Sequence, residues 1–265
     1  MVNTVTLYGM KHSHPVLAAR LMLRRKGISY NTRDILPGLH AAVVRFAGFP
    51  GPTVPAMQLG GHKVQGTLDI SRALDEAFPQ SPLFPADPAQ RAAVEEAERW
   101  AHEHLQPIAM RVFRWAGETD NGVRAWMASE VMHWPAADVL GYGFKPVMMY
   151  WARVVNARAD QVRNDLGDLP ARLEHADQLM HDGVIGSDEL NAADCQVYAS
   201  LRLLAAHEDL HPLVTSYHCG RRALELVPDF PIAAAGERPA TSVPAALPTQ
   251  WLPVGAGNVV AVARA

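Results

Sequence analysis

Cysteine is scarce in this chain: its 265 residues include only two, Cys195 and Cys219. Sparse cysteine argues against a disulfide framework and is typical of a reducing compartment. The chain also lacks an uninterrupted apolar run of the roughly 20 residues that a membrane span needs. Its first residues lack the basic-then-apolar pattern of a secretory signal. These absences predict a cytoplasmic protein with no membrane partner.

An excess of charge of one sign is missing as well, because the formal net charge is only −3 at pH 7. Nucleic-acid-binding domains carry a basic patch or stripe, so the sequence predicts no nucleic-acid partner. What the chain does have is apolar side chains, at 49% of its residues, which is enough for a large buried core. Its length suits two domains, or one domain with a substantial helical appendage.

The N-terminal part has the pattern of a small α/β unit. It predicts a strand, a helix, a strand, a loop, a two-stranded hairpin and a helix, in that order: 4–8, 14–26, 28–34, 36–52, 56–65 and 67–78. Gly27 ends the first helix, and the pair Gly60-Gly61 is a hairpin signal. Thr67 caps the last helix.

Four prolines between residues 79 and 88 separate this unit from a half in which helical periodicity dominates. The predicted helices cover 91–116, 122–132, 146–180, 192–206 and 213–226. Asn191 and Asp194 form a capping box at the fourth of them. The tail from 232 onward is rich in proline and alanine and predicts irregular chain, with Trp251 and Leu252 able to dock. The predicted organisation is 1–79, α/β domain; 80–88, linker; 89–230, all-helical domain; 231–265, tail.

Two short segments of the first domain carry its candidate chemistry. Ser13 stands where the first helix begins, and a helix N-terminus offers unpaired backbone N–H groups and partial positive charge to an anion. Thr53-Val54-Pro55 puts a proline just before a strand, which leaves the backbone groups of the preceding residue free. Together they predict a place that holds the sulfur and the peptide backbone of a small thiol. Taken without the second segment, Ser13 is better explained as an ordinary helix cap.

Taken in order with two further segments, these segments resemble the soluble glutathione transferase family over about residues 3–228. The further segments are Gly66-Thr67-Leu68-Asp69-Ile70 and Asn191-Ala192-Ala193-Asp194. The resemblance implies a fold of class α/β plus all-α, with a thioredoxin-like N-terminal domain followed by a helical-bundle C-terminal domain. Family members commonly dimerise, so a homodimer is expected.

The resemblance also implies a role for each matching residue. Ser13 takes the position of the group that contacts the glutathione sulfur, and Val54 pairs through its backbone with the cysteinyl part. Pro55 is the family's cis-proline, and Thr67 receives the γ-glutamyl carboxylate at a helix N-terminus. His14 is a candidate for bordering the thiol, and His40 or Arg45 for contacting a carboxylate of the tripeptide. Tyr8 is the candidate that would replace Ser13 as the activating hydroxyl. Packing against the sheet explains Tyr8 better than such activation.

One position departs from the family pattern. The family usually has Glu or Gln directly before the capping Ser or Thr, whereas this chain has Gly66, with Gln65 one residue earlier. The change removes a side chain that holds the amino end of the tripeptide. Two cosubstrates therefore stay open: glutathione, held weakly or through Gln65, and another low-molecular-weight thiol.

The energetics of thiol activation are within reach of Ser13. A free thiol with a pKa of about 8.5 is only about 3% thiolate at neutral pH, and lowering that pKa by about two units requires about 2.7 kcal/mol. A hydroxyl that donates to a charged sulfur offers about 1.5–3 kcal/mol, and the helix terminus about 0.3–1 kcal/mol more. Ser13 therefore acts as a donor without ionising, and the bound thiolate is the nucleophile. Because a hydroxyl cannot form a mixed disulfide, disulfide exchange through Ser13 is not expected.

Aromatic and thioether side chains crowd residues 115–151, as they do in pockets for apolar ligands. Trp115, Tyr142 and Phe144 are the candidates for contacting an apolar electrophile, although each taken alone is better explained by a core or dimer-face position. The string 207–211 matches the zinc pattern H-E-x-x-H, but Pro212 follows it and it lies between two predicted helices, so an interhelical turn is expected. No metal and no tightly bound cofactor are predicted.

The sequence thus predicts an enzyme that activates a small thiol and conjugates it to an apolar electrophile. A thiol-dependent isomerase or dehalogenase uses the same apparatus and is not separated from it by these residues. The alternative from a different class is a non-catalytic binding protein on the same fold, which Gly66 favours.

Overall fold

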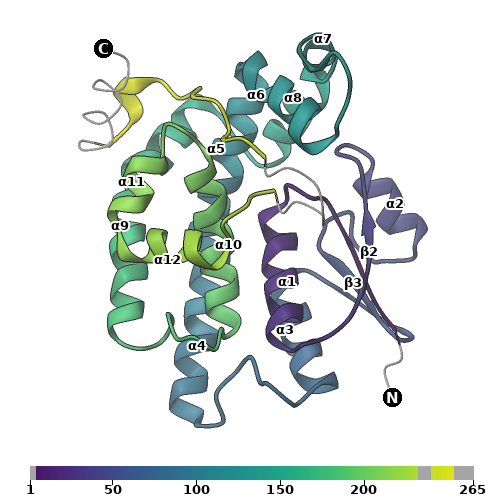
Figure 1. Cartoon of the computed structure of the whole chain (residues 1–265), viewed down its shortest axis with the longest axis vertical. Helices are drawn as coiled ribbons and strands as arrows, with labels where there is room; N and C mark the ends of the chain where they lie inside the picture. The colour runs from purple at the N-terminus through teal and green to yellow at the C-terminus, as the bar shows by residue number, and fades with distance from the viewer. Residues whose placement is uncertain (1–3, 232–239, 254–265) are drawn as a thin grey trace. The chain divides into compact units, whose positions relative to one another are not determined.

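The structure, a computed structural model, describes residues 4–231 and 240–253. The chain divides into two compact units, one of Met1–His102 with Leu179–Ala199 and one of Glu103–Gln178 with Ser200–Ala265 (Figure 1). The predicted α/β domain and the proline-rich linker both lie in the first unit. Within the predicted tail, residues 232–239 and 254–265 lie outside the described residues.

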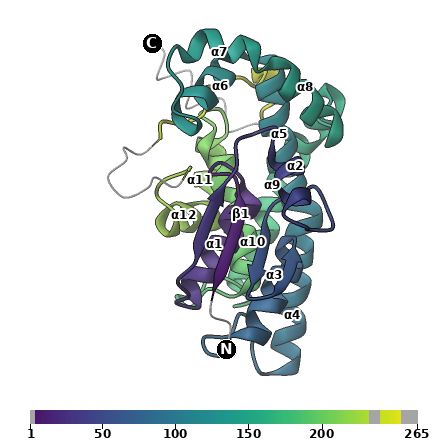
Figure 2. The same ribbon diagram turned by 90° about the vertical axis from the view of Figure 1, so that its right-hand side faces the viewer.

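The first unit is built on a four-stranded sheet of order β2-β1-β3-β4. Its elements are β1 (Val5–Gly9), α1 (His14–Arg25), β2 (Asn31–Asp34), α2 (His40–Phe46), β3 (Ala56–Leu59), β4 (His62–Gln65) and α3 (Thr67–Ala77). β1 and β2 are parallel because α1 crosses between them, and the tight turn at Gly60-Gly61 makes β3 and β4 antiparallel. Figures 1 and 2 show α1 and α3 side by side next to the sheet.

One predicted loop contains a helix. Residues 36–52 were expected to be irregular because of their prolines and glycines, but α2 forms inside them. With only seven residues and two buried positions, His40 and Val44, α2 is too short to show helical periodicity in the sequence. It forms because Val44 packs with a small apolar cluster made of Ile35, Phe49 and Ala56. Tertiary packing therefore decides this element.

The start of the linker is fixed by a buried lysine. The Nζ atom of Lys26, at the end of α1, lies 2.8 Å from Asp75 and donates to the carbonyl oxygens of Phe78 and Ser81. Asp75 also accepts from the backbone N–H of Leu83 at 2.7 Å. The lysine side chain is fully buried, and a buried charge is tolerated only with such partners. This network joins the ends of α1 and α3 to the linker.

The linker leads into α4 (Pro88–Trp100), where Asp87 caps the helix by accepting from the backbone N–H of Gln90. One continuous helix was predicted over 91–116. The structure instead has α4, a π-helical turn (Ala101–Leu105) and α5 (Gln106–Thr119). Pro107 lies in the first turn of α5 and has no N–H to donate, so the regular ladder is interrupted before it.

The described helices of the second unit follow the predicted order with more breaks. They are α5, α6 (Asn121–Trp126), a π-helical turn (Met127–Val131), α7 (Ala137–Gly143), α8 (Lys145–Val154), α9 (Ala159–His181), the end of α10 (Ala192–Ala206), α11 (His211–Ser216) and α12 (His218–Leu226). The helix predicted over 146–180 was wrong in its continuity. Between α8 and α9, Asn156 adopts φ 55°, a left-handed conformation that ends a helix and that asparagine tolerates. The helix predicted over 213–226 is likewise two helices, because Tyr217 is extended.

Part of the predicted tail docks on the second unit. Backbone N–H groups of Ala246 and Leu247 donate to the carboxylate of Asp209 at 2.6 and 2.8 Å, and Val243 is fully buried. The ring of Trp251 lies 4.9 Å from that of Trp115, centroid to centroid. Docking of Trp251 is therefore confirmed, and the short 3-10 helix Thr249–Trp251 presents it.

Gly167→Ala should raise the free energy of unfolding by about 0.5–1 kcal/mol, because glycine in a helix interior is less favourable than alanine by about that amount. Gly167 lies within α9, and a methyl group there would meet no atom of a neighbouring element within 4 Å. Gly141→Ala is the matched control, since its methyl group would lie 3.0 Å from the backbone nitrogen of Ala125. Urea denaturation should show opposite shifts, and equal shifts would contradict the packing seen at these two positions.

Candidate functional site

Strand register brings the predicted site segments to one edge of the sheet. Tyr8 pairs with Ala56, and Ala56 pairs with Gln65. The chain that follows β1, the chain that precedes β3 and the chain that follows β4 therefore meet at this edge, which we call the shared edge. A backbone hydrogen bond of 3.0 Å from Gly66 to the carbonyl oxygen of Pro55 closes it. Two helices, α1 and α3, begin here.

Ser13 occupies the N-cap position of α1 without using its side chain as a cap. Its backbone is extended, with φ −85° and ψ 114°, and its carbonyl oxygen accepts from the N–H of Leu17 at 2.9 Å. The hydroxyl makes no capping hydrogen bond, and the residue is half-buried. The first N–H groups of α1 have no partner within the helix. Ser13 thus combines a hydroxyl not engaged in capping with a helix N-terminus, the pairing that an anionic sulfur needs.

The peptide bond between Val54 and Pro55 is cis, as the resemblance implied. Gln65 holds the loop in front of it. The amide oxygen of Gln65 accepts from the N–H of Gly51 at 2.7 Å, and its amide nitrogen donates to the carbonyl oxygens of Gly51 and Thr53 at 3.0 and 2.6 Å. Both N–H groups of that amide are therefore used. In this arrangement Gln65 positions the cis-proline loop.

The start of α3 holds a buried hydroxyl with no hydrogen-bond partner among the described residues. The prediction that Thr67 caps this helix was wrong, because Gly66 is the N-cap residue and Thr67 is the first residue of α3. Thr67 is only 2% exposed, and its Oγ1 is the unpartnered atom. Gly66, just before it, has φ 92° and ψ 149°, a conformation that strongly favours glycine. The N–H groups of the first turn of α3 are also free of intrahelical partners. A buried polar atom of this kind calls for a ligand or water, and a carboxylate would accept from the hydroxyl and from those N–H groups.

The other predicted polar residues have different surroundings. His14 and His40 are buried at the starts of α1 and α2, whereas Arg45 is exposed near the end of α2. Tyr8 packs edge-on against Phe49, with ring centroids 5.2 Å apart. This contact is the packing role that the sequence favoured for Tyr8.

The three candidate electrophile contacts all lie in the second unit but differ in environment. Trp115 on α5 contacts Trp251, and Phe144 lies buried beside Trp134 with ring centroids 6.3 Å apart. Tyr142 on α7 is 67% exposed. Contact with an electrophile stays a prediction for all three.

Neither cysteine fits the role of nucleophile. Cys195 and Cys219 are fully buried, and burial raises the pKa of both thiols. A buried, protonated thiol is a poor nucleophile. A sulfur nucleophile at the shared edge would therefore come from a bound thiol.

The zinc-like string is occupied by structural contacts. His207 is fully buried, the carboxylates of Glu208 and Asp209 accept from backbone N–H groups of residues 245–247, and His211 starts α11. No group of three His, Cys, Asp or Glu side chains that could hold a metal occurs in residues 4–231 and 240–253. Over the same residues, no helix is both long enough and apolar enough to cross a membrane. The string is the interhelical turn that was expected.

The buried carboxylate of Glu98 was not foreseen from the sequence. Glu98 of α4 is fully buried, where it accepts hydrogen bonds from Ser71 and Arg72 of α3. The available signal was its spacing: Glu98 shares a helix face with the buried residues Val94, Ala97 and Ala101. A carboxylate in an apolar stripe predicts a buried partner.

A comparison with protein families and a comparison with curated proteins both found similar proteins. A family model described as the glutathione S-transferase N-terminal domain matches residues 7–82. Maleylacetoacetate isomerase of Rhizobium meliloti (strain 1021) is 25% identical over 165 residues, which cover 56% of this chain and 78% of that protein.

Solved structures show the same fold. A glutathione transferase from Populus trichocarpa has a TM-score of 0.56 at 18% identity, over 85% of this chain and 93% of that one. Maleylacetoacetate isomerase from Anaeromyxobacter dehalogenans 2CP-1, solved with GSH bound in its active site, has a TM-score of 0.50 at 22% identity, over 84% of this chain and 89% of that one. The matched domain is the βαβαββα unit described above, and helices follow it. Residues 7–82 thus belong to the glutathione S-transferase N-terminal domain family, and the fold is a thioredoxin-like N-terminal domain followed by an all-helical C-terminal domain.

Proposed function

We propose that the protein is a glutathione transferase-like enzyme that binds a small thiol, glutathione in the first instance, and adds it as a thiolate to an apolar electrophile. The observation that supports this most is the shared edge itself. It brings together a serine whose hydroxyl is not used as a cap, a cis-proline loop, and a helix start with a buried, unpartnered hydroxyl. These three features suit the sulfur, the peptide backbone and the carboxylate of one tripeptide.

In the proposed reaction, Ser13 donates its hydroxyl proton in a hydrogen bond to the sulfur and keeps that proton throughout. The thiol proton leaves to solvent, and the thiolate attacks the electrophilic carbon. A carbon–sulfur bond forms as the leaving group departs with its electron pair, or as the electrons move into an adjacent acceptor. The backbone N–H and C=O of Val54 pair with the cysteinyl part, and Thr67 with the N-terminus of α3 holds the γ-glutamyl carboxylate.

Isomerisation is a second candidate because the curated relative at 25% identity is a maleylacetoacetate isomerase. In an isomerase the thiolate adds to a conjugated double bond and is later expelled, so the thiol is regenerated. A dehalogenase would use the same thiolate to displace halide. The residues at the shared edge serve all three reactions equally, and the electrophile decides among them. A binding protein without turnover remains the alternative that Gly66 favours.

Affinity capture on immobilised glutathione, followed by a conjugation assay with 1-chloro-2,4-dinitrobenzene, tests the proposal. Binding with turnover supports the enzyme, and binding without turnover on conjugation, isomerisation and dehalogenation substrates supports the binding protein. Failure to bind glutathione would contradict glutathione as the cosubstrate and turn the search to other low-molecular-weight thiols. Light scattering on the purified chain tests the proposed homodimer.

Gly66→Glu should tighten glutathione binding about five- to tenfold, because a carboxylate at this position can accept a charge-assisted hydrogen bond from the γ-glutamyl amino group. A Cβ atom at Gly66 has room, since within 4 Å it would meet no atom of the described residues other than those of its two chain neighbours. Because Gly66 has φ 92°, which is strained for any residue with a side chain, the substitution should lower the free energy of unfolding by about 1–3 kcal/mol. Titration calorimetry measures the affinity.

Gly66→Ala is the matched control for Gly66→Glu, because it carries the same backbone strain and no carboxylate. The alanine variant should be destabilised and should bind glutathione no better than wild type. Equal affinities for the two variants would mean that the amino end of glutathione does not approach this position, which would favour a different thiol.

A further inference from the structure

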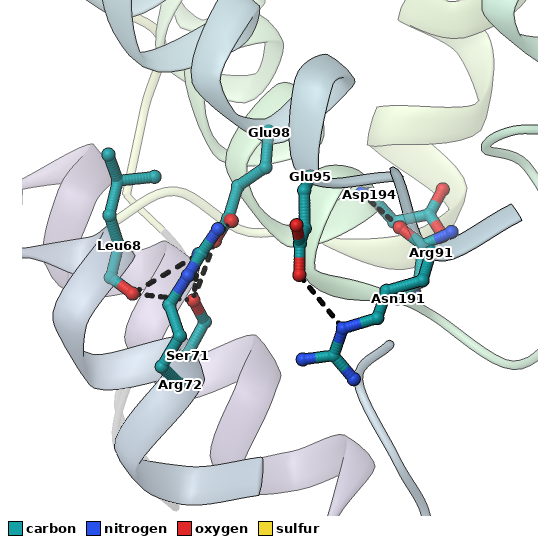
Figure 3. Close-up of polar contacts among 8 residues, drawn as sticks. All are labelled: Leu68, Ser71, Arg72, Arg91, Glu95, Glu98, Asn191 and Asp194. Atoms are coloured by element: carbon teal, nitrogen blue, oxygen red, sulfur yellow. Dashed lines mark hydrogen bonds and ion pairs between the residues drawn. The ribbon is translucent and has the colours of Figure 1, made fainter. Parts of the chain in front are cut away.

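We propose that Glu98 is a positioning residue for the thiol site: from α4 it holds the first turns of α3, and so aims the helix start that receives the carboxylate of the cosubstrate. The inference rests on the proposed function, and it names a residue outside the shared edge. Figure 3 shows the contacts that carry it.

Glu98 contacts α3 through both carboxylate oxygens. Its Oε1 accepts from the hydroxyl of Ser71 at 2.7 Å, and its Oε2 accepts from Nη1 of Arg72. The hydroxyl of Ser71 also lies 2.8 Å from the carbonyl oxygen of Leu68, and Nη1 of Arg72 lies 2.8 Å from that hydroxyl and 3.2 Å from that carbonyl. Leu68 directly follows Thr67, so the network reaches the first turn of α3.

Burying the carboxylate of Glu98 costs free energy, and an apolar side chain would fill the same space without that cost. Glu98 is 0% exposed, and burial raises its pKa even though the hydrogen bonds from Arg72 and Ser71 oppose the rise. Replacing a buried ion pair by apolar residues of similar volume is often neutral or stabilising. The directional contacts of Glu98 therefore point to a need for fixed geometry between α3 and α4.

The start of α3 has such a need. Its N-cap residue, Gly66, has no side chain that could cap the helix, and glycine is the residue type with the greatest backbone freedom. At the cap, backbone hydrogen bonds from Gly66 to Pro55 and from Ile70 to Gly66 hold the chain, but no capping side chain restrains the first N–H groups, and carboxylate binding depends on their direction. In this chain the contacts of Glu98 with Ser71 and Arg72 restrain the first turns of α3, a role that a capping side chain would otherwise have.

Glu98→Gln is the test, because glutamine keeps an acceptor for Ser71 but places an N–H group against the guanidinium of Arg72. The dissociation constant of glutathione should rise about five- to tenfold, while kcat at saturating glutathione stays within about twofold. Glu95→Gln is the matched control. Glu95 lies on the same helix, is 37% exposed and pairs with Arg91 at 2.9 Å (Figure 3), so its substitution should leave the dissociation constant unchanged.

Two outcomes of the binding measurement would overturn the proposal. Loss of a negative charge near a bound anion would by itself tighten binding, so stronger binding by Glu98→Gln would mean that the charge of Glu98 matters and its tether does not. A lower melting temperature with unchanged affinity would mean that Glu98 only stabilises the fold. Should Glu98→Gln fail to fold, Ser71→Ala decides, since it removes one arm of the network and leaves the ion pair.

A measurement without ligand separates this proposal from the proposed function. Hydrogen exchange of the peptide over residues 66–74 should be faster in Glu98→Gln than in Glu95→Gln or wild type. If wild type fails to bind glutathione, the proposed function fails, and exchange still decides whether Glu98 holds the helix start. Unchanged exchange in this peptide would refute the tether.

Discussion

Ser13→Ala should lower kcat/KM for glutathione conjugation about 10- to 150-fold, which corresponds to the loss of about 1.5–3 kcal/mol from a hydrogen bond to a charged sulfur. The dissociation constant of glutathione should change little, because Val54, Pro55 and Thr67 would still hold the tripeptide. The pKa of the bound glutathione thiol should rise by about one to two units. Ultraviolet absorbance of the thiolate, followed against pH in the complex, measures that rise directly.

Tyr8→Phe is the matched control for Ser13→Ala. The Tyr8 ring packs against Phe49 and a buried apolar cluster, and phenylalanine keeps that packing while it removes the hydroxyl. We expect activity close to wild type from this variant. The reverse pattern, with activity lost in Tyr8→Phe and kept in Ser13→Ala, would contradict the assignment of Ser13 and make Tyr8 the activating hydroxyl.

Local sequence signals were enough to place the shared edge. A helix start at Ser13, a proline before a short strand and a second helix start at Thr67 are each encoded within a few neighbouring residues. Strand pairing then brings the three together, and the hairpin at Gly60-Gly61 sets the register of two of the strands. Elements with strong local signals were therefore predicted well.

Elements that depend on distant packing were not predicted. α2 exists because Val44 meets a cluster assembled from other parts of the chain. The break before α9 depends on one left-handed asparagine, Asn156, which no local pattern distinguishes from a helical one.

Hydrogen bonds between side chains and residues on other elements were also not predicted from the sequence. Gln65 was considered as a ligand contact, but its amide holds Gly51 and Thr53. Glu98 was not considered at all, although Ser71 and Arg72 meet it from another helix. These roles depend on which elements become neighbours, and periodicity within one element carries no such information.

Acidification should destabilise the protein through His207, by about 3 kcal/mol between pH 6.5 and about pH 4. Burial lowers the pKa of His207 from 6.5 to about 4. Neither ring nitrogen has a hydrogen-bond partner among the described residues, and the ring lies 5.9 Å from that of Phe113, centroid to centroid. As pH falls, the unfolded chain binds the proton first, so the free energy of unfolding falls until pH reaches the folded pKa and then levels off.

His207→Leu should remove this part of the pH dependence, because leucine has no proton to bind in either state. Denaturant unfolding at pH 7 and at about pH 4.5 gives the loss of stability for each protein, and wild type should lose about 2–3 kcal/mol more than the variant. His104→Leu, at an exposed position, controls for the removal of an imidazole and should lose as much as wild type. Equal losses in wild type and His207→Leu would contradict the prediction and would mean that the ring at position 207 reaches solvent or a partner before it titrates.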